Sequence, residues 1–497
     1  MLLPDLETFT KAAAEFEFVP VYRRLLSDSL TPVSAFELLD DGRGACLFES
    51  VVGGEKVGRF SFLAIAPIFR IAAYGTRVVQ TDLSSGHEET SEQADPLDFF
   101  RNLLRHSVAH FPGLPPFTGG AVGYAGYDVV RYVERLPNPP VDDRRLPDLD
   151  FSLYHTIIVF DNVTKTMTIL VLVRSADHAS NATAYADAAR RIEEIVARLS
   201  QPIPALRAAD VGGTPREAIR VESNFTQASF MAAVDKCIEY IRAGDIFQVV
   251  PSQRFRVHST VAPLEVYRSL RVINPSPFMF FLRTPECELI GSSPEIMCRV
   301  LDRQVTVRPL AGTRPRGASE AEDRALETEL LADPKERAEH VMLVDLGRND
   351  IGRVAQFGSV ALTEIMVVER YSHVMHISSE VQGTLRVEFD AFDALKACLP
   401  AGTVSGAPKV RAMEVIDEVE PHRRGPYAGA VGYIDYGGNM DTCIALRTIV
   451  AHQGIFDVQA GCGVVADSDP QAEFQETVNK ARGMIRAIEL THARLGK

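Results

Sequence analysis

Residues 155–173 contain two apolar runs, His155-Thr-Ile-Ile-Val-Phe160 and Met167-Thr-Ile-Leu-Val-Leu-Val173, separated by the polar segment Asp161-Asn-Val-Thr-Lys165. Runs of this length that are rich in branched residues, on either side of a turn, predict a β-hairpin. Similar runs occur closer to the N-terminus, at 46–52 and 59–65. We therefore expect the N-terminal part of the chain to consist mostly of strands.

Helices and strands are mixed in the rest of the chain without a regular strand–helix alternation, which favours an α+β fold over a doubly wound sheet. Apolar residues at helical spacing predict helices at 96–105, 181–199, 226–243, 319–331, 334–355, 390–399, 408–420 and 470–491. Strands are expected at 246–257, 277–283, 287–291, 296–300, 428–436 and 441–451. The Pro- and Gly-containing stretch 201–220 predicts a linker between an N-terminal region, 1–200, and a C-terminal region, 221–497.

Composition excludes several classes of protein. The 497 residues carry a formal net charge of −14, which argues against a nucleic-acid surface. No apolar run is long enough to cross a membrane, and the N-terminus lacks the pattern of a signal peptide. Seven dispersed cysteines without a paired spacing are typical of reduced thiols. We expect a cytoplasmic protein that binds neither nucleic acid nor a membrane.

Two Glu-x-x-Glu pairs, Glu336/Glu339 and Glu473/Glu476, each place two carboxylates on one face of a helix. Two such helices facing each other would gather carboxylates that repel one another unless a hard cation lies between them. The pairs therefore predict a Mg²⁺ site and a reaction on an anionic substrate. For the second helix, a solvated face with a Glu476–Lys480 pair remains the alternative.

The first of these helices, 334–355, is apolar nearly all round and is therefore predicted to be buried. A buried Glu339 would need a partner. Glu336 has another explanation, because Asp333 as N-cap, Pro334 at N1 and Glu336 at N3 form a capping-box start. Glu339 is therefore favoured as the direct metal ligand, and His340 is expected in the core or behind the ligands.

Several other segments could hold an anion. Gly402-Thr-Val-Ser-Gly-Ala-Pro-Lys409 is a glycine-rich loop that opens a helix, with Pro408 at N1, and Ala460-Gly-Cys-Gly-Val464 is either a second set of backbone donors or a tight turn. Arg447, in a predicted strand, would bind a carboxylate or form a structural salt bridge. Glu295 follows a strand and could serve as a general acid if protonated.

Eight segments, in order, resemble the chorismate-utilising enzymes, and most closely the synthase subunits of anthranilate synthases. They are 247–254, 291–295, 309–313, 335–340, 402–408, 425–429, 444–448 and 473–480. The resemblance implies a two-lobed fold in which large antiparallel sheets pack face to face with helices on the outside. It also implies that the N-terminal region is regulatory and that the C-terminal region binds chorismate.

The resemblance implies a role for particular residues. Mg²⁺ would be held by Glu339 and Glu476, with Glu336 and Glu473 outside them, and would bind a chorismate carboxylate. Glu295 is expected to protonate the leaving hydroxyl. The other residues implied in the site are His376, which would assist pyruvate elimination, Thr403, Gly312, Thr313, Tyr427, Arg447, Gly461, Cys462, Gly463 and Lys480. Cys462 stands where the family usually has alanine, but the contact there is through the backbone.

Two positions help to choose the branch of the family. Isochorismate and salicylate synthases carry a water-activating lysine at the position of Gln248, and aminodeoxychorismate synthases typically carry a nucleophilic lysine at that of Ala311. Neither residue of this chain can do the same. This favours conversion of chorismate and ammonia to anthranilate and pyruvate, the first committed step of tryptophan biosynthesis. An aminodeoxychorismate synthase, or a silent tryptophan-binding regulator, remains the alternative.

The resemblance also implies regulation and a partner. Leu47-Phe-Glu-Ser50 and Gly58-Arg-Phe-Ser61 resemble the L-tryptophan feedback site of the family, although a structural strand end is the simpler explanation of Glu49 and Ser50. The chain has no G-x-C-x-G nucleophile with a later H-x-E, so use of glutamine would require a separate glutamine amidotransferase subunit, in a heterotetramer. The implied tryptophan site comprises Glu49, Ser50, Asn274, Pro277, Phe278 and Met279.

Overall fold

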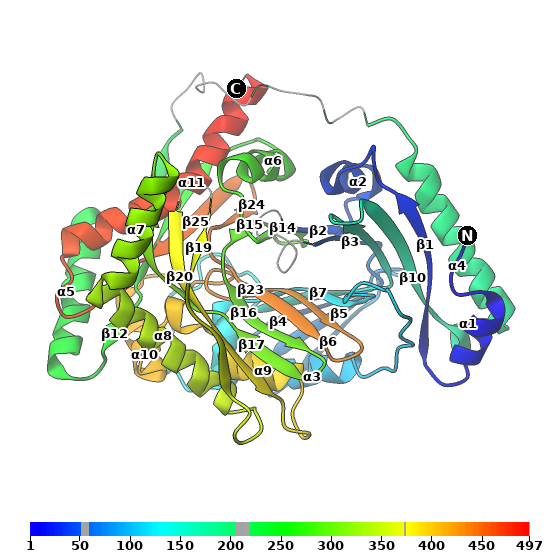
Figure 1. The fold of residues 1–497 in the computed structure, drawn as a ribbon, viewed down its shortest axis with the longest axis horizontal. Helices are drawn as coiled ribbons and strands as arrows, with labels where there is room; N and C mark the ends of the chain where they lie inside the picture. Colours follow the sequence, from blue (N-terminus) through cyan, green and yellow to red (C-terminus); the bar gives the residue numbers. More distant parts are fainter. Residues whose placement is uncertain (51–58, 204–205, 207–209, 211–218, 372–373, 497) are drawn as a thin grey trace.

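The computed structural model describes residues 1–50, 59–203, 206, 210, 219–371 and 374–496. Two large sheets form its centre and helices cover their outer faces (Figure 1). All strand pairs between the named strands are antiparallel in the described residues. The expected α+β class, with antiparallel sheets packed face to face, is confirmed.

The first sheet has eleven strands. The predicted hairpin is present in it, because Thr166 of one strand pairs with Asp161 of the other across the turn. In spatial order the strands are β1 (Phe18–Leu26), β10 (Thr166–Arg174), β9 (Thr156–Asp161), β3 (Phe60–Ile65), β2 (Cys46–Glu49), β14 (Phe278–Arg283), β15 (Glu288–Ser293), β24 (Thr448–His452), β25 (Ile455–Gly461), β13 (Ser252–His258) and β11 (Val221–Ser223).

The second sheet has twelve strands, and a separate short pair lies beside it. The order is β18 (Leu310–Pro315), β20 (Val374–Thr384), β17 (Gln304–Val307), β16 (Ile296–Leu301), β23 (Met440–Ile444), β22 (Ala430–Asp435), β7 (Gly120–Ala125), β8 (Leu149–Tyr154), β4 (Phe69–Tyr74), β5 (Arg77–Asp82) and β6 (Glu88–Glu92), with β19 (Ala361–Arg370) on β20. The separate pair is β12 (Gln248–Val249) with β21 (Gly406–Ala407).

Each of the two sheets contains strands from both sides of the predicted linker. Leu47 of β2 pairs with Phe281 of β14, and Tyr124 of β7 pairs with Val431 of β22. The regions 1–200 and 221–497 therefore share one framework, and their division into regulatory and catalytic parts stays a prediction. Most of the predicted linker lies outside the described residues.

Helices pack on the outer faces of the sheets. The first sheet carries α1 (Leu6–Ala12), α2 (Pro32–Leu39), α4 (Asn181–Leu199), α6 (Pro263–Ile273) and α11 (Pro470–Leu495). The second carries α3 (Pro96–Leu103), α5 (Gln227–Ala243), α8 (Pro334–Gly352), α9 (Ala391–Cys398) and α10 (Lys409–Val419). A third core, which includes Tyr124, Phe280 and Tyr433, fills the space between the sheets. The remaining helices are α7 (Glu320–Ala332) and the 3₁₀ turns η1 (Tyr127–Tyr132), η2 (Ser175–Asp177) and η3 (Gly402–Val404).

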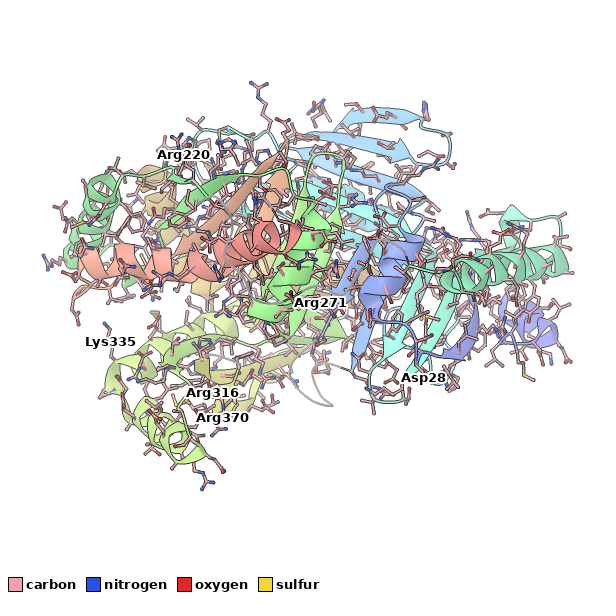
Figure 2. All side chains as sticks on the ribbon, turned by 90° about the horizontal axis from the view of Figure 1, so that it is seen from above. Asp28, Arg220, Arg271, Arg316, Lys335 and Arg370 are labelled. Carbon is pink, nitrogen blue, oxygen red and sulfur yellow. The ribbon has the colours of Figure 1, made fainter. Side chains whose placement is uncertain are left out.

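Helices α7 and α8 form a projecting part of the molecule, marked by Arg316, Lys335 and Arg370 in Figure 2, on the side away from Asp28. Helix α8 is not buried all round, contrary to the prediction, since the side chain of Val341 is 49% exposed. Its apolar residues cover only one flank of the sheet. No helix in the described part of the chain is long and apolar enough to cross a membrane.

Candidate active site

The two Glu-x-x-Glu helices bring their carboxylates near one another. Glu339 of α8 accepts a hydrogen bond from Gln248 Nε2 at 3.1 Å. Burial raises the pKa of Glu339, and the nearby negative charges of Glu336 and Glu476 add to this rise. The sequence pattern therefore corresponds to a real cluster of negative charge between α8 and α11.

On α11, Glu473 and Glu476 differ in their surroundings. Glu476 is exposed and pairs with Lys480, 2.7 Å away, and Lys480 also donates to the Gly461 carbonyl at 3.1 Å. The structural pair named as the alternative is thus present. Glu473 is partly buried, burial raises its pKa, and its Oε2 has no hydrogen-bond partner among the described residues.

A metal site is not complete in this cluster. In the described residues, no three His, Cys, Asp or Glu side chains converge closely enough to hold a metal ion. Mg²⁺ in proteins is commonly held by one or two carboxylates, with water and substrate oxygens in its other positions. The partly buried Glu339, the nearby Glu476 and the unpartnered Glu473 Oε2 outside them fit a cation that binds together with an anionic ligand.

Glu336 differs from its predicted capping role. Asp333 does cap α8 through its side chain, which accepts from the backbone N–H groups of Lys335 and Glu336. The Asp333 N–H, however, donates to the preceding helix, so the reciprocal half of a capping box is missing. The Glu336 carboxylate instead pairs with Arg314 at 3.2 Å.

Glycines allow the chain to approach this cluster closely. A Cβ on Gly461 would lie 2.9 Å from the Pro251 carbonyl oxygen, and one on Gly463 would lie 2.8 Å from Gln248 Nε2. Cys462 between them is fully buried and its N–H donates to the same Pro251 carbonyl. The Gly463 N–H has no acceptor within the described chain, so it can donate to a ligand.

Arg447 does not lie in a strand, contrary to the prediction. The run 441–451 is divided into β23 and β24, and Arg447 in the connection has a φ of 48°. Burial lowers the pKa of its guanidinium. It forms no ion pair and no side-chain hydrogen bond with any residue that the structure describes. A half-buried arginine of this kind favours an anionic ligand over the structural salt bridge.

His376 lies beside the glycine of β18. Its Nδ1 is 3.1 Å from the Gly312 carbonyl oxygen and 3.0 Å from the Thr313 hydroxyl. Burial, together with the charge of Arg447, lowers the pKa of His376 to about 4. The imidazole is therefore neutral near pH 7. A carbonyl can only accept, so the proton is assigned to Nδ1, which leaves Nε2 free to accept a proton.

Glu295 is a buried carboxyl with only weak hydrogen-bond support. It lines a small cavity of about 30 Å³ together with Thr403, and its closest backbone donor, the N–H of Leu310, is 3.4 Å away. Burial raises the pKa of Glu295 to about 8, and the neighbouring Thr403 opposes this only in part. Glu295 is therefore protonated near pH 7, as a general acid must be.

Tyr427 is buried, and its hydroxyl would lie 3.1 Å from a Cβ placed on Gly461. Burial raises its pKa, while the charge of Arg424 opposes the rise. Its hydroxyl is thus an uncharged donor at the edge of the Gly461–Gly463 turn.

A second and larger cavity lies between the two sheets. It measures about 270 Å³, and five of the six residues predicted to bind tryptophan line it: Glu49, Ser50, Pro277, Phe278 and Met279. Asn274 is not among the lining residues, and Gly58 lies outside the described residues. The opposite wall comes from the second sheet, including Arg299, Tyr433 and Asp441.

The carboxylate of Glu49 is already engaged in this structure. It accepts from the Tyr267 hydroxyl at 2.7 Å and pairs with Arg271, 2.8 Å away on α6. Arg271 is labelled in Figure 2, and Figure 1 shows α6 above β14 and β15. Glu49 therefore ties β2 to α6, which agrees with the simpler structural explanation of this residue.

Sequence reasoning missed three residues that shape the site. Gln248 was noted only as a substitute for lysine, yet it is the partner of Glu339. The ring of Tyr371 packs edge-to-face against the His376 ring, with 5.6 Å between the ring centroids. Arg424 lies behind Tyr427. The segment His422-Arg-Arg-Gly425 could have drawn attention to an arginine, but nothing in the pattern separates Arg423 from Arg424.

This site and fold define a class of protein. The model of the family described as chorismate binding enzyme matches residues 45–486, and the chain belongs to that family. Anthranilate synthase component 1 of Pseudomonas putida is 48% identical over 486 residues, covering 96% of this chain and 97% of the relative. The corresponding protein of Acetivibrio thermocellus is 43% identical, with 98% and 99% covered.

Solved structures agree. The crystal structure of anthranilate synthase component I from Streptococcus pneumoniae TIGR4 has a TM-score of 0.76 at 38% identity, covering 93% of this chain and 99% of that one. These similarities place the chain in the anthranilate synthase component 1 branch of the family. The menaquinone-specific isochorismate synthase MenF from Escherichia coli, at 19% identity and a TM-score of 0.69 with 97% and 98% covered, shares the fold.

Proposed function

We propose that the chain converts chorismate and ammonia to anthranilate and pyruvate. Ammonia forms a C–N bond at the ring carbon next to the carboxylate-bearing carbon, and the ring hydroxyl leaves as water. A ring proton is then removed while the C–O bond to the enolpyruvyl group breaks. The observation that carries this proposal is Glu295, a carboxyl that burial keeps protonated and that can supply the proton for the leaving hydroxyl.

Other residues of the site would bind the carboxylates of chorismate and remove the ring proton. Arg447, free of any protein anion among the described residues, binds the enolpyruvyl carboxylate together with Tyr427. His376 accepts the ring proton at Nε2, because its Nδ1 is held at the Gly312 carbonyl. Lys480 donates to the Gly461 carbonyl, and the Gly463 N–H lies in the same turn. Thr403 lies beside Glu295 at the same small cavity.

We infer that Mg²⁺ joins Glu339 and Glu476 when chorismate binds. When bound, Mg²⁺ would orient the ring carboxylate and withdraw electron density from the diene. Glu336 is held by Arg314, which suits it as an outer carboxylate, and we assign the same outer position to Glu473 on α11. Titration calorimetry is the test: chorismate should bind with Mg²⁺ and bind far more weakly with EDTA, and Glu339→Gln should remove that difference. Equal binding with and without EDTA would refute the metal assignment.

Product analysis tests the reaction itself. With chorismate, Mg²⁺ and ammonium, the purified chain should form a fluorescent aromatic amine and one pyruvate per turnover. An aminodeoxychorismate synthase would instead release a non-aromatic product that keeps the enolpyruvyl group. Ala311, buried in β18, offers no nucleophile for that branch. A silent regulator would form neither product.

The source of ammonia is a separate proposal. Because the sequence has no glutaminase motif, we infer that a glutamine amidotransferase subunit supplies ammonia when glutamine is the donor. Turnover with ammonium alone, and with glutamine only after such a subunit is added, is the expected result. Strict dependence on the subunit even with ammonium would contradict it.

We further infer that L-tryptophan binds the cavity between the sheets and inhibits the reaction. The cavity is large enough for an indole ring, and polar groups of Ser50, Arg299 and Asp441 line it. Ser50→Phe should fill it, so inhibition by tryptophan should be relieved with little loss of activity. Ser84→Phe, at an exposed turn after β5 and away from the cavity, is the control. Unchanged inhibition in Ser50→Phe would exclude this cavity.

A further inference from the structure

Arg424 is an arginine buried completely beneath the candidate active site. Its side chain is among the largest fully buried side chains of the described chain. It forms a two-pronged ion pair with Glu420, with Nη2 2.6 Å from Oε1 and Nε 3.0 Å from Oε2. Glu420 in turn accepts from the N–H and the hydroxyl of Ser252 at 2.7 and 2.8 Å.

The same guanidinium holds two loops of the site. Its Nη1 donates to the Val404 carbonyl at 2.7 Å, and its Nη2 donates to the Val250 carbonyl at 2.6 Å. Val404 directly follows Thr403. Val250 directly precedes Pro251, whose carbonyl accepts the N–H of Cys462 in the Gly461–Gly463 turn. One side chain therefore sets the spacing between the loop beside Glu295 and the turn beside the carboxylates.

Arg424 also lies behind Tyr427. Its guanidinium carbon is 5.6 Å from the centre of the Tyr427 ring and 4.6 Å from that of Tyr127. A buried positive charge on a phenol ring makes the hydroxyl a stronger hydrogen-bond donor. The hydroxyl of Tyr427, at the edge of Gly461, is therefore both placed and polarised from behind.

A buried ion pair of this kind is not needed for stability alone. Desolvation of the two charges offsets much of their attraction, and apolar residues of similar volume often serve equally well. What apolar residues cannot do is hold two backbone carbonyls, a carboxylate and two aromatic rings in a fixed relation. Only the planar fork of arginine provides that geometry.

We propose that Arg424 is a positioning residue for chorismate, which fixes Thr403, Tyr427 and the Gly461–Gly463 turn in register through Val404, Val250 and Glu420. The proposal rests on the proposed function. It does not give Arg424 contact with the substrate or with the reacting atoms.

The test compares two Arg→Lys variants. Arg424→Lys keeps the charge but cannot reach both carbonyls and Glu420 in one plane. Arg131→Lys is the matched control, because Arg131 forms a similar two-pronged pair with Asp417 of α10, with both contacts at 2.8 Å. The hydrogen bonds of Arg131 go to Asp128, Leu136 and Asp417, none of which is a predicted substrate residue.

We expect Arg424→Lys to lower kcat/KM by about 100-fold, mostly through KM, because small displacements of positioned groups have effects of this size. The dissociation constant for chorismate should rise in parallel, and the melting temperature should fall no further than in Arg131→Lys. Equal KM values and equal chorismate binding in the two variants would overturn the proposal.

A second variant and an assay of the wild-type protein complete the test. If Arg424→Lys does not fold, Ser252→Ala serves instead, because it removes one donor to Glu420 and leaves the arginine in place. This variant should raise KM several-fold. An unchanged KM would again refute the proposal. Wild-type protein is assayed first. Absence of anthranilate from the wild type refutes the proposed function, whereas chorismate binding in the variants still decides the role of Arg424.

Discussion

At the scale of single residues, the site depends on groups whose usual charge states are altered by burial. The Glu295 carboxyl forms no ion pair with any residue that the structure describes, so burial raises its pKa to about 8 and it keeps its proton. His376 is shifted the other way, to a pKa of about 4, and remains neutral. An acid and a base whose pKa values lie on opposite sides of neutrality can both act at pH 7.

The raised pKa of Glu295 predicts a pH dependence. As the proposed general acid, Glu295 would act in its protonated form, so kcat/KM at a fixed concentration of free ammonia should stay level below about pH 8 and fall as the pH rises above it. Glu295→Gln should lose about 10²- to 10⁴-fold in activity and lack this fall. Steady-state rates from pH 6 to 10 give the measurement. Glu288→Gln, which breaks only a pair with Arg283, should keep the wild-type profile.

At the scale of elements, the β14–β15 hairpin joins the two candidate sites. β14 begins with Phe278 and continues to Met279, both of which line the cavity between the sheets, and β15 ends two residues before Glu295. The hairpin is held at its centre by Phe280, whose ring lies over Gly291. A ligand in the cavity and the candidate acid Glu295 therefore share one pair of strands.

The contact between Phe280 and Gly291 predicts a stability effect. A Cβ on residue 291 would lie 2.0 Å from ring carbon Cζ, and the ring is fully buried, so it has no room to move. Gly291→Ala should lower the free energy of unfolding by about 1–3 kcal/mol. The midpoint of urea unfolding gives the measurement.

Gly352→Ala is the matched control. A Cβ there meets nothing within 4 Å. Because alanine restricts the unfolded chain, this variant should be neutral or more stable by about 0.4–1 kcal/mol. If the two alanine variants unfold at the same urea concentration, the packing argument is wrong.

Local patterns predicted the elements well where local spacing decides them. The helix predicted at 181–199 agrees with α4 because its apolar spacing and its Ser180 cap are both contained in the segment. The closeness of the two Glu-x-x-Glu pairs was also predicted from local spacing, and Glu336 and Glu476 do lie near Glu339. Arg447 could not be placed in the same way, because the break between β23 and β24 depends on its backbone turning at a φ of 48°. Which strands pair across the whole chain is likewise absent from any local pattern.

At the scale of the whole molecule, the two ranges on either side of residues 201–220 are not separate bodies. β2 pairs with one edge of β14, and β7 pairs with one edge of β22. Each range taken alone would expose long unpaired strand edges and the apolar faces that form the core between the sheets. The framework of the candidate active site therefore depends on residues that form no part of it.

This sharing predicts the behaviour of fragments. Residues 221–497 expressed alone should aggregate or remain unfolded, and co-expression with residues 1–200 should restore a soluble complex that binds chorismate. Size-exclusion chromatography and circular dichroism give the measurement, with the full-length chain as the control. A monomeric 221–497 fragment that unfolds cooperatively would contradict the prediction.

The pairing of β2 with β14 has a consequence for synthesis on the ribosome. Roughly 230 residues separate these partners in the chain. At about 5–20 residues per second, the edge of β2 waits about 10–50 s for its neighbour to emerge. The N-terminal strands β1, β10, β9, β3 and β2 can assemble earlier, so the nascent chain carries a half-finished sheet with an open edge. Slow translation of the second half would lengthen that exposure, and chaperones that cover strand edges would be needed most during this interval.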